Sequence, residues 1–330
     1  MPEGHLILLR GRIDKPRHQA KTMTDTLPPK VPFHALTLQA HSKGYLVVGI
    51  DGEFLQLDED FQSVDEVRKP FPMAVRHTCV ADGTFVATWI DHELLMARMA
   101  AFDCSEAITD GPERGSLRTR TTLESAQHPS GSLWSHVLDA EPLALCGHED
   151  GFAFVLYKKG IYTMGNDAGE HWRIELPTWP ELTKLPRAND VVTAAFDNGL
   201  LKVWSRGGGT QAYDVQTGDL VSTNVNHYDG VLEHVYCQHG QELHVYDNGS
   251  VVWRTEGMAL IDAKLSGPVQ HAFWSKSENA WRIAGWREEL FLSADGLKTS
   301  KMQEIPVHIV LNKGKTYLLL NDGSWLHSHY

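Results

Sequence analysis

Short apolar runs alternate with turn sequences along most of the chain. Runs such as YLVVGI, TFVATWI, LLKVWS, ELHVYD and TYLLLND each have the length and composition of one β-strand. Between such runs lie dipeptides that accept the positive φ angles of tight hairpins, namely Asp51-Gly52, Asp82-Gly83, Asp150-Gly151, Asn198-Gly199, Asn248-Gly249, Asp295-Gly296 and Asp322-Gly323. The segment 92–102 has some helical spacing, but we predict a buried strand there. The pattern predicts an all-β chain of short antiparallel hairpins.

Histidines recur at a fixed spacing in the C-terminal third of the chain. His234, His271 and His308 follow one another in steps of 37 residues, and a hairpin turn lies fourteen residues after each of them. Repeats of this length accommodate four short strands, which is the size of one β-propeller blade. In the unit that begins at His234 we predict strands at roughly 232–237, 241–246, 250–255 and 259–264.

The same frame extends upstream and gives seven units. They begin near residues 34, 77, 145, 193, 234, 271 and 308, with histidine at the first position in the units of His34 and His77 as well. We therefore predict a single β-propeller of seven four-stranded blades over residues 31–330. Six or eight blades also fit, because the third unit is stretched and irregular.

The last unit ends at Tyr330 after only three predicted strands, which leaves one blade incomplete. The N-terminal sequence HLILLR is a strand without a partner, so we predict that it completes this blade and closes the ring. Residues 1–30 are then a closing strand and a linker. A start of translation at Met23 instead of Met1 would remove this strand.

Two insertions interrupt the repeat, at about 104–134 and 165–190. Long loops on a rigid scaffold are where binding residues concentrate. We expect Trp134 and Trp179 to contact a partner, because tryptophan is enriched at interface hot spots, and Arg118 and Arg120 to form a local basic patch. The alternatives are that the tryptophans hold each loop on its own blade and that the arginines protect an edge strand.

The sequence GNDAGEHW (165–172) resembles the Asp-box hairpin of sialidases and related propellers. Asp167, Gly169 and Trp172 match the S-x-D-x-G-x-x-W pattern, whereas Gly165 stands where that family has serine. The Gly147-His148 pair and the strand ends VWS and VVW are similar to features of WD repeats. These resemblances imply a propeller fold, with Asp167 supporting a turn and Trp172 packing between strands. They imply no particular activity.

Composition and charge narrow the function classes. The chain has 330 residues and a formal charge of −12, so an acidic body is expected to repel nucleic acid. No apolar run reaches the roughly 18 residues that span a bilayer, and the N-terminus lacks the features of a secretory signal. Four widely spaced cysteines, with no CxxC pair, are typical of reduced thiols in a cytosolic protein. We therefore expect a cytoplasmic protein that binds neither nucleic acid nor membranes.

The recurrent histidines admit two interpretations. They are His34, His77, His234, His271 and His308, each at or near the start of a predicted innermost strand. Imidazoles converging on a propeller axis would bind a transition metal and activate water, an arrangement similar to that of metal-dependent propeller enzymes such as carotenoid oxygenases and oligogalacturonate lyases. The alternative, which we favour, is that each histidine packs between blades and bonds to the backbone of the next blade.

The sequence favours a non-enzymatic platform that binds other proteins in a cytosolic assembly and needs no cofactor. The motifs GxSxG, HExxH and GxGxxG are absent from the sequence, and the loops differ in length from unit to unit. The alternative function is a metal-dependent lyase or hydrolase that uses the ring of histidines. The sequence does not identify the partner or the oligomeric state.

Overall fold

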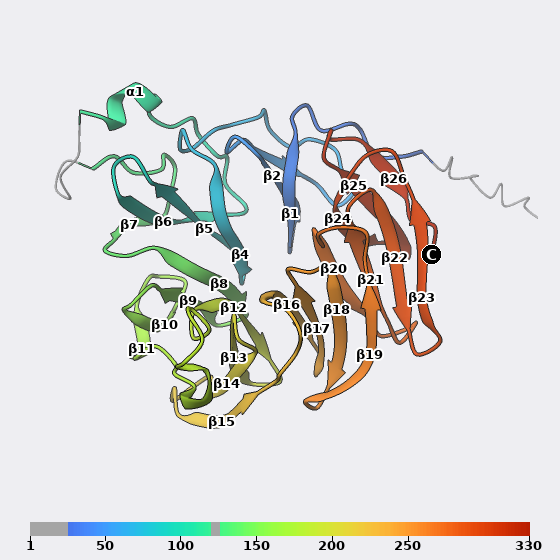
Figure 1. The fold of residues 1–330 in the computed structure, drawn as a ribbon. Helices are drawn as coiled ribbons and strands as arrows, with labels where there is room; N and C mark the ends of the chain where they lie inside the picture. Colours follow the sequence, from blue (N-terminus) through green and yellow to red (C-terminus); the bar gives the residue numbers. More distant parts are fainter. Residues whose placement is uncertain (1–25, 120–125) are drawn as a thin grey trace, which may run out of the picture.

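Seven antiparallel sheets surround a common axis and form a β-propeller (Figure 1). The computed structural model describes residues 26–119 and 126–330. The predicted closing strand at 5–10 lies outside the described residues, as do most of the linker that follows it and Arg120. The predicted all-β fold and the seven blades are confirmed.

Each blade is a meander that begins at the axis and runs outward. The innermost strands are β1 (Ala35–His41), β4 (Val75–Ala81), β8 (Pro142–His148), β12 (Val191–Asp197), β16 (Leu232–Gln238), β20 (His271–Ser275) and β24 (Pro306–Asn312). The second strands are β2 (Gly44–Gly49), β5 (Thr84–Asp91), β9 (Gly151–Leu156), β13 (Leu200–Ser205), β17 (Gln241–Tyr246), β21 (Ala280–Gly285) and β25 (Lys315–Leu320).

The third strands are β3 (Phe54–Leu57), β6 (Met96–Asp103), β10 (Gly160–Met164), β14 (Gly209–Asp214), β18 (Ser250–Thr255), β22 (Glu288–Ser293) and β26 (Trp325–His327). Five blades have a fourth, outer strand, namely β7 (Trp134–Leu138), β11 (Glu170–Ile174), β15 (Leu220–Val225), β19 (Met258–Lys264) and β23 (Gly296–Lys301). The helical segments among the described residues are α1 (Arg114–Leu117) and a 3-10 turn at Pro180–Leu182.

Hairpin turns follow the sequence pattern. Asp82-Gly83 and Asn198-Gly199 both have positive φ angles at both residues, as the tight turn between twisted strands requires. The four strands predicted for the unit of His234 match β16 to β19 to within one residue at each end, and the segment 92–102 contributes the buried strand β6 instead of a helix. These local predictions are confirmed.

Two predictions about the blades need correction. The predicted insertion 165–190 contains β11, the outer strand of the third blade, so only 175–190 lies outside the repeat. Among the described residues, the first blade has three strands where we predicted four. In place of an outer strand, a loop forms single β-bridges at Ser63 and Arg68, and Phe61 in this loop packs into the core between the first and last blades despite a φ of 60°.

Apolar side chains fill the wedges between neighbouring blades. Trp89, Trp204 and Trp281 sit on second strands and are completely buried. Each blade packs its two faces against two different neighbouring blades. Because the blades twist, the gap between neighbours widens, and a large planar side chain fills it. These tryptophans therefore belong to the cores between blades.

The first and last blades meet through the segment before β1. The N–H of Val31 donates to the carbonyl of Gly323 at 2.8 Å, and the N–H of Ala35 donates to Asn321 at 3.0 Å. Lys30 forms an ion pair with Asp322 at 2.9 Å. Apolar residues of both blades then share one core cluster. The ring is therefore closed within the described residues.

The C-terminal residues cross from the seventh blade to the sixth. The Ser328 hydroxyl and the His329 N–H donate to the buried carboxylate of Glu289, and Arg282 donates to the backbone oxygen of Tyr330 at 2.6 Å. These contacts hold the end of the chain against a neighbouring blade, so the last blade is linked on both sides.

Closure predicts a difference between two glycines of the last blade. A Cβ at Gly323 would lie 2.2 Å from the carbonyl oxygen of Val31, whereas a Cβ at Gly314 would meet nothing within 4 Å, and both φ angles are positive. We expect Gly314→Ala to cost about 1 kcal/mol through backbone conformation alone. Gly323→Ala should cost about 1–3 kcal/mol more, because the closing segment must move.

Urea unfolding of the two variants beside the wild type measures this difference. Equal destabilisation by both substitutions would show that the contact between Val31 and Gly323 does not support the ring.

Candidate functional site

The innermost strands surround a central channel, because each of them contacts the inner strands of both neighbouring blades. We call the face of the disc on which these strands begin the upper face. It carries the connections between blades and the turns between second and third strands. The lower face carries the turns that follow the innermost strands.

One position near the start of each innermost strand is structurally equivalent around the ring. All of these strands except β20 shift register beside it. The residues there are Thr37, His77, Ala144, Thr193, His234, His271 and His308. Thr37, and not His34, therefore occupies the repeated position in the first blade.

His34 lies away from this ring of side chains. It precedes β1, its side chain is exposed, and its Nδ1 is 3.2 Å from the carbonyl oxygen of Asn321. Four of the five predicted histidines thus come to the channel wall. The fifth belongs to the junction that closes the ring.

The channel histidines contact the backbone or side chains of the next blade. His77 Nε2 lies 3.1 Å from the carbonyl oxygen of Pro142, and His271 Nδ1 accepts a hydrogen bond from the Ile309 N–H at 3.3 Å. His308 stacks on His271 with ring centroids 3.6 Å apart and lies 3.5 Å from the Thr37 hydroxyl. Each of these contacts joins neighbouring blades.

Close packing keeps these imidazoles neutral. Burial lowers the pKa of His77 to about 4, with a smaller effect from the charge of Arg76. Burial alone lowers the pKa of His234 to about 4, and burial together with the neighbouring imidazole lowers that of His271 to about 3. The pKa of His308 is also well below its usual value, chiefly through burial.

The chemistry of neutral imidazole suits a transition metal, but the geometry does not bring enough ligands together. Among the described residues, no three His, Cys, Asp or Glu side chains form a group able to hold a metal ion. Two of the ring histidines already bond to backbone. The arrangement is suited to linking blades.

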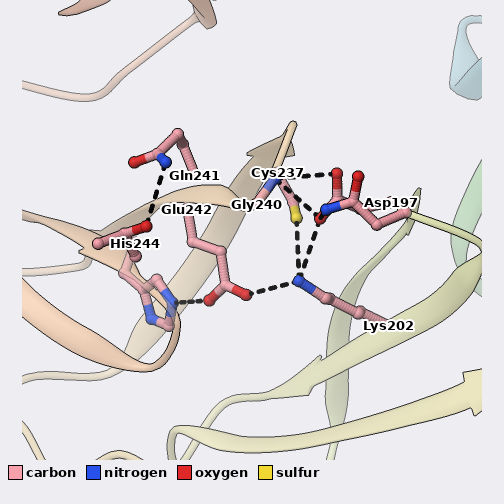
Figure 2. A network of polar contacts seen from close by, with 9 residues as sticks. Asp197, Lys202, Cys237, Gly240, Gln241, Glu242 and His244 are labelled. Carbon is pink, nitrogen blue, oxygen red and sulfur yellow. Dashed lines mark hydrogen bonds and ion pairs between the residues drawn. The ribbon is translucent and has the colours of Figure 1, made fainter. Parts of the chain in front are cut away.

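A buried polar network joins the fourth and fifth blades (Figure 2). The ammonium of Lys202 lies 3.2 Å from carboxylate oxygens of both Asp197 and Glu242, and 3.9 Å from the sulfur of Cys237. Asp197 also accepts the N–H of Gly240 at 3.1 Å from both of its oxygens. Polar groups of both blades thus form hydrogen bonds and ion pairs with one another away from solvent.

His244 completes this network. Its side chain is fully buried and its Nε2 lies 2.9 Å from Glu242. The pKa of His244 is lowered, chiefly by burial, so the neutral ring donates its N–H to the carboxylate. Burial opposes ionisation of Glu242, but the bond from His244 and the charge of Lys202 outweigh it and lower the pKa of the carboxyl. The charged groups of this network are therefore paired with one another and link the two blades.

Three cavities adjoin one another on the upper face. The first, of about 420 Å³, lies beside the second blade, and Leu94, Leu95 and Leu138 contribute apolar surface to its walls. The second, of about 440 Å³, lies at the channel mouth, where the starts of four innermost strands meet. The third, of about 390 Å³, lies beside the fifth blade. Glu141 lines the first two cavities and Glu233 the last two, so we call the three together the upper-face groove.

The channel mouth concentrates charges of both signs. Arg76, Arg206, Glu141 and Glu233 all line this cavity, and none of them forms an ion pair with another described residue. Arg187 is paired with Asp190 at 2.8 Å. Unpaired charges in a concave site are available to a ligand or partner.

The predicted binding residues of the insertions have diverse surroundings. Trp179 is buried beneath the 175–190 loop and donates from Nε1 to Thr210, while Trp134 stacks on Phe152 and is partly buried. Arg118 is exposed and pairs with Glu93 at 3.1 Å. The structure does not bring the three together. Partner binding by these residues stays a prediction.

The hairpin at 165–172 has the geometry that the Asp-box resemblance implies. Asp167 accepts the N–H of Gly169 at 2.9 Å and supports the turn. Trp172 donates from Nε1 to Val215 of the next blade and packs against Gly218. The motif therefore links the third blade to the fourth.

Sequence reasoning missed two residues of the upper face. Trp286 is 45% exposed, in the turn after β21, and its side chain covers Gly267 at the edge of the groove. Leu95 is 91% exposed, with a φ of 52° that leucine rarely adopts. The signal was present for Trp286, since AGWREE places a tryptophan at a turn.

Comparisons with known proteins agree on the fold. No protein-family model matches the chain, and no curated protein matches it. It is similar to the β-propeller domain of Cps50 (Swd1) from Myceliophteria thermophila, with a TM-score of 0.65 and 8% identity over 92% of this chain and 98% of that one. It is also similar to BamB from Moraxella catarrhalis, with a TM-score of 0.54 and 12% identity over the same shares of each chain. These likenesses show a WD40-like propeller fold.

The neutral histidines predict acid sensitivity. Because their folded pKa values lie below the unfolded value of 6.5, the unfolded chain binds more protons between about pH 6.5 and 4. Stability is therefore full above pH 6.5 and falls on acidification, by up to about 1.4 kcal/mol per pH unit for each such histidine. Urea unfolding from pH 7 to 4.5 measures this slope.

A double variant separates the channel histidines from others. His234→Gln with His271→Gln should make the slope shallower, whereas His92→Gln, at an exposed position, should leave it unchanged. An unaltered slope in the double variant would contradict the assignment.

The network of Figure 2 predicts a non-additive response. Lys202→Met leaves Asp197 and Glu242 as unpaired buried carboxylates and should cost roughly 3 kcal/mol of unfolding free energy. Adding Asp197→Asn and Glu242→Gln removes those charges and should restore part of the loss. A triple variant less stable than Lys202→Met, in thermal and urea unfolding, would show that the two ion pairs are not the reason why Lys202 stabilises the fold.

Proposed function

We propose that this protein is a non-enzymatic binding platform that holds another protein on its upper face within a cytosolic assembly. The observation that carries the proposal is the set of three neighbouring cavities around the channel mouth, in which Glu141 and Glu233 each line two cavities. A row of neighbouring hollows on a rigid ring suits an extended or irregular protein surface.

The side chains of the groove suit a partner of mixed character. Leu95 and Trp286 expose apolar surface at its two ends, while Arg76 and Arg206 offer unpaired charges at the channel mouth. Interfaces commonly combine such apolar anchors with a polar rim. Maintaining an exposed leucine at a positive φ costs stability, and partner binding accounts for that cost.

Other features support the cytosolic setting. All four cysteines are free, which suits a reducing compartment. No helix among the described residues is long and apolar enough to cross a membrane.

The metal-dependent lyase or hydrolase remains the alternative proposal, and the site supports it less well. It requires several histidine nitrogens that face one another and are free of backbone bonds. His77 and His271 bond to the next blade instead, and His34 lies elsewhere.

Matched leucine substitutions on the two faces test the platform. Leu95→Asp alters the groove, and aspartate tolerates the positive φ at this position. Leu311→Asp alters an exposed leucine near the end of β24, on the lower face. Affinity purification of tagged chains with quantitative mass spectrometry should recover a partner with wild type and with Leu311→Asp. Leu95→Asp and Trp286→Ala should reduce its recovery at least about tenfold, the effect of losing one hot-spot contact.

Two results would overturn the proposal. One is the absence of any stoichiometric partner in repeated purifications, and the other is equal loss of the partner with Leu95→Asp and Leu311→Asp. Thermal unfolding of each variant verifies that the chain is folded.

A further inference from the structure

β15, the outer strand of the fourth blade, differs from the other outer strands in its side chains. Its sequence, LVSTNV, contains no acidic, basic or imidazole group, whereas β7, β11, β19 and β23 each contain at least one. Natural sheets protect their edges with charges, because an unprotected edge pairs with other chains. β15 has no such protection.

The edge of β15 is also open. Within the described chain β15 pairs only with β14, and five of its six residues are exposed. Leu220 and Val221 are 54% and 57% exposed. Backbone groups and apolar side chains are therefore both available for pairing.

The order of side chains in β15 is symmetric about Thr223. Val221 and Val225 lie two residues to either side, and Ser222 and Asn224 one residue to either side. A register shift leaves Val221 as a bulge, so the regular part of this edge is 222–225. Antiparallel pairing of two copies about a two-fold axis at Thr223 places Thr223 opposite the partner subunit's Thr223 and Ser222 opposite the partner subunit's Asn224. Pairs of β-branched residues and of hydroxyl groups are favourable across antiparallel strands, and no like charges face one another.

We propose that a second copy of this chain pairs with β15 in this way and extends the fourth blade into a sheet that continues through both copies. Six residues bury less than the roughly 800 Å² per partner that a stable interface needs. The loop 175–190 supplies further area, because Val225 packs against its core and Leu185 in the same loop is 56% exposed.

A cysteine at position 223, on the proposed two-fold axis, tests the register of the pairing between the two copies of β15. Directly opposite residues of antiparallel strands have Cα atoms about 4.5–5.5 Å apart, within disulfide range. Thr223→Cys should form a disulfide-linked dimer on mild oxidation, as measured by non-reducing electrophoresis. Thr299→Cys, at an exposed position on β23, is the matched control. Cross-linking of Thr223→Cys no greater than that of Thr299→Cys would overturn the proposal.

Sedimentation of the full chain without a cross-link tests the dimer itself. The wild type should be dimeric in the upper micromolar range, and Thr223→Lys, which brings two ammonium groups together, should raise the dissociation constant at least tenfold. Thr299→Lys should leave it unchanged. A monomeric wild type throughout that range, or a folded Thr223→Lys variant as dimeric as the wild type, would contradict the proposal.

Discussion

Closure of the ring is the constraint on which the rest of the structure depends. Seven twisted sheets leave no exposed inner face only if the first blade packs against the last. Here the backbone bonds of Val31 and Ala35 to the final blade, and the core shared by both blades, provide that contact. Within the described residues both blades at this junction have three strands, and in the first blade the loop containing Phe61 lies beside β3 through single β-bridges.

The same constraint explains the channel histidines. Innermost strands that converge on an axis leave little room, and one equivalent position near the start of each strand, beside a register shift in every blade except that of β20, recurs around the ring. Imidazole is small and planar and bonds to backbone while neutral, as His77 and His271 show. A repeated residue therefore indicates a repeated packing requirement before it indicates chemistry.

Much of the fold follows from local sequence, but the site does not. The 37-residue spacing and the Asp-Gly and Asn-Gly turns predict the blades, because hairpins are local structures. His34 is the residue that fits the repeated histidine in the sequence alignment of the blades. The register shift beside Thr37 instead places Thr37 at the repeated position of the innermost strand. Trp179 shows the same limit. Its burial depends on the path of the loop 175–190, which spacing does not encode.

The interior of the ring and its upper face differ in character. The histidines and the Lys202 network link blades, whereas the upper-face groove offers unpaired charges and exposed apolar side chains. Hydrogen–deuterium exchange of the chain with and without its purified partner tests this division most directly. We expect slower exchange in the upper-face turns that contain Leu95, Tyr157 and Trp286. Protection confined to the lower-face turns would contradict it.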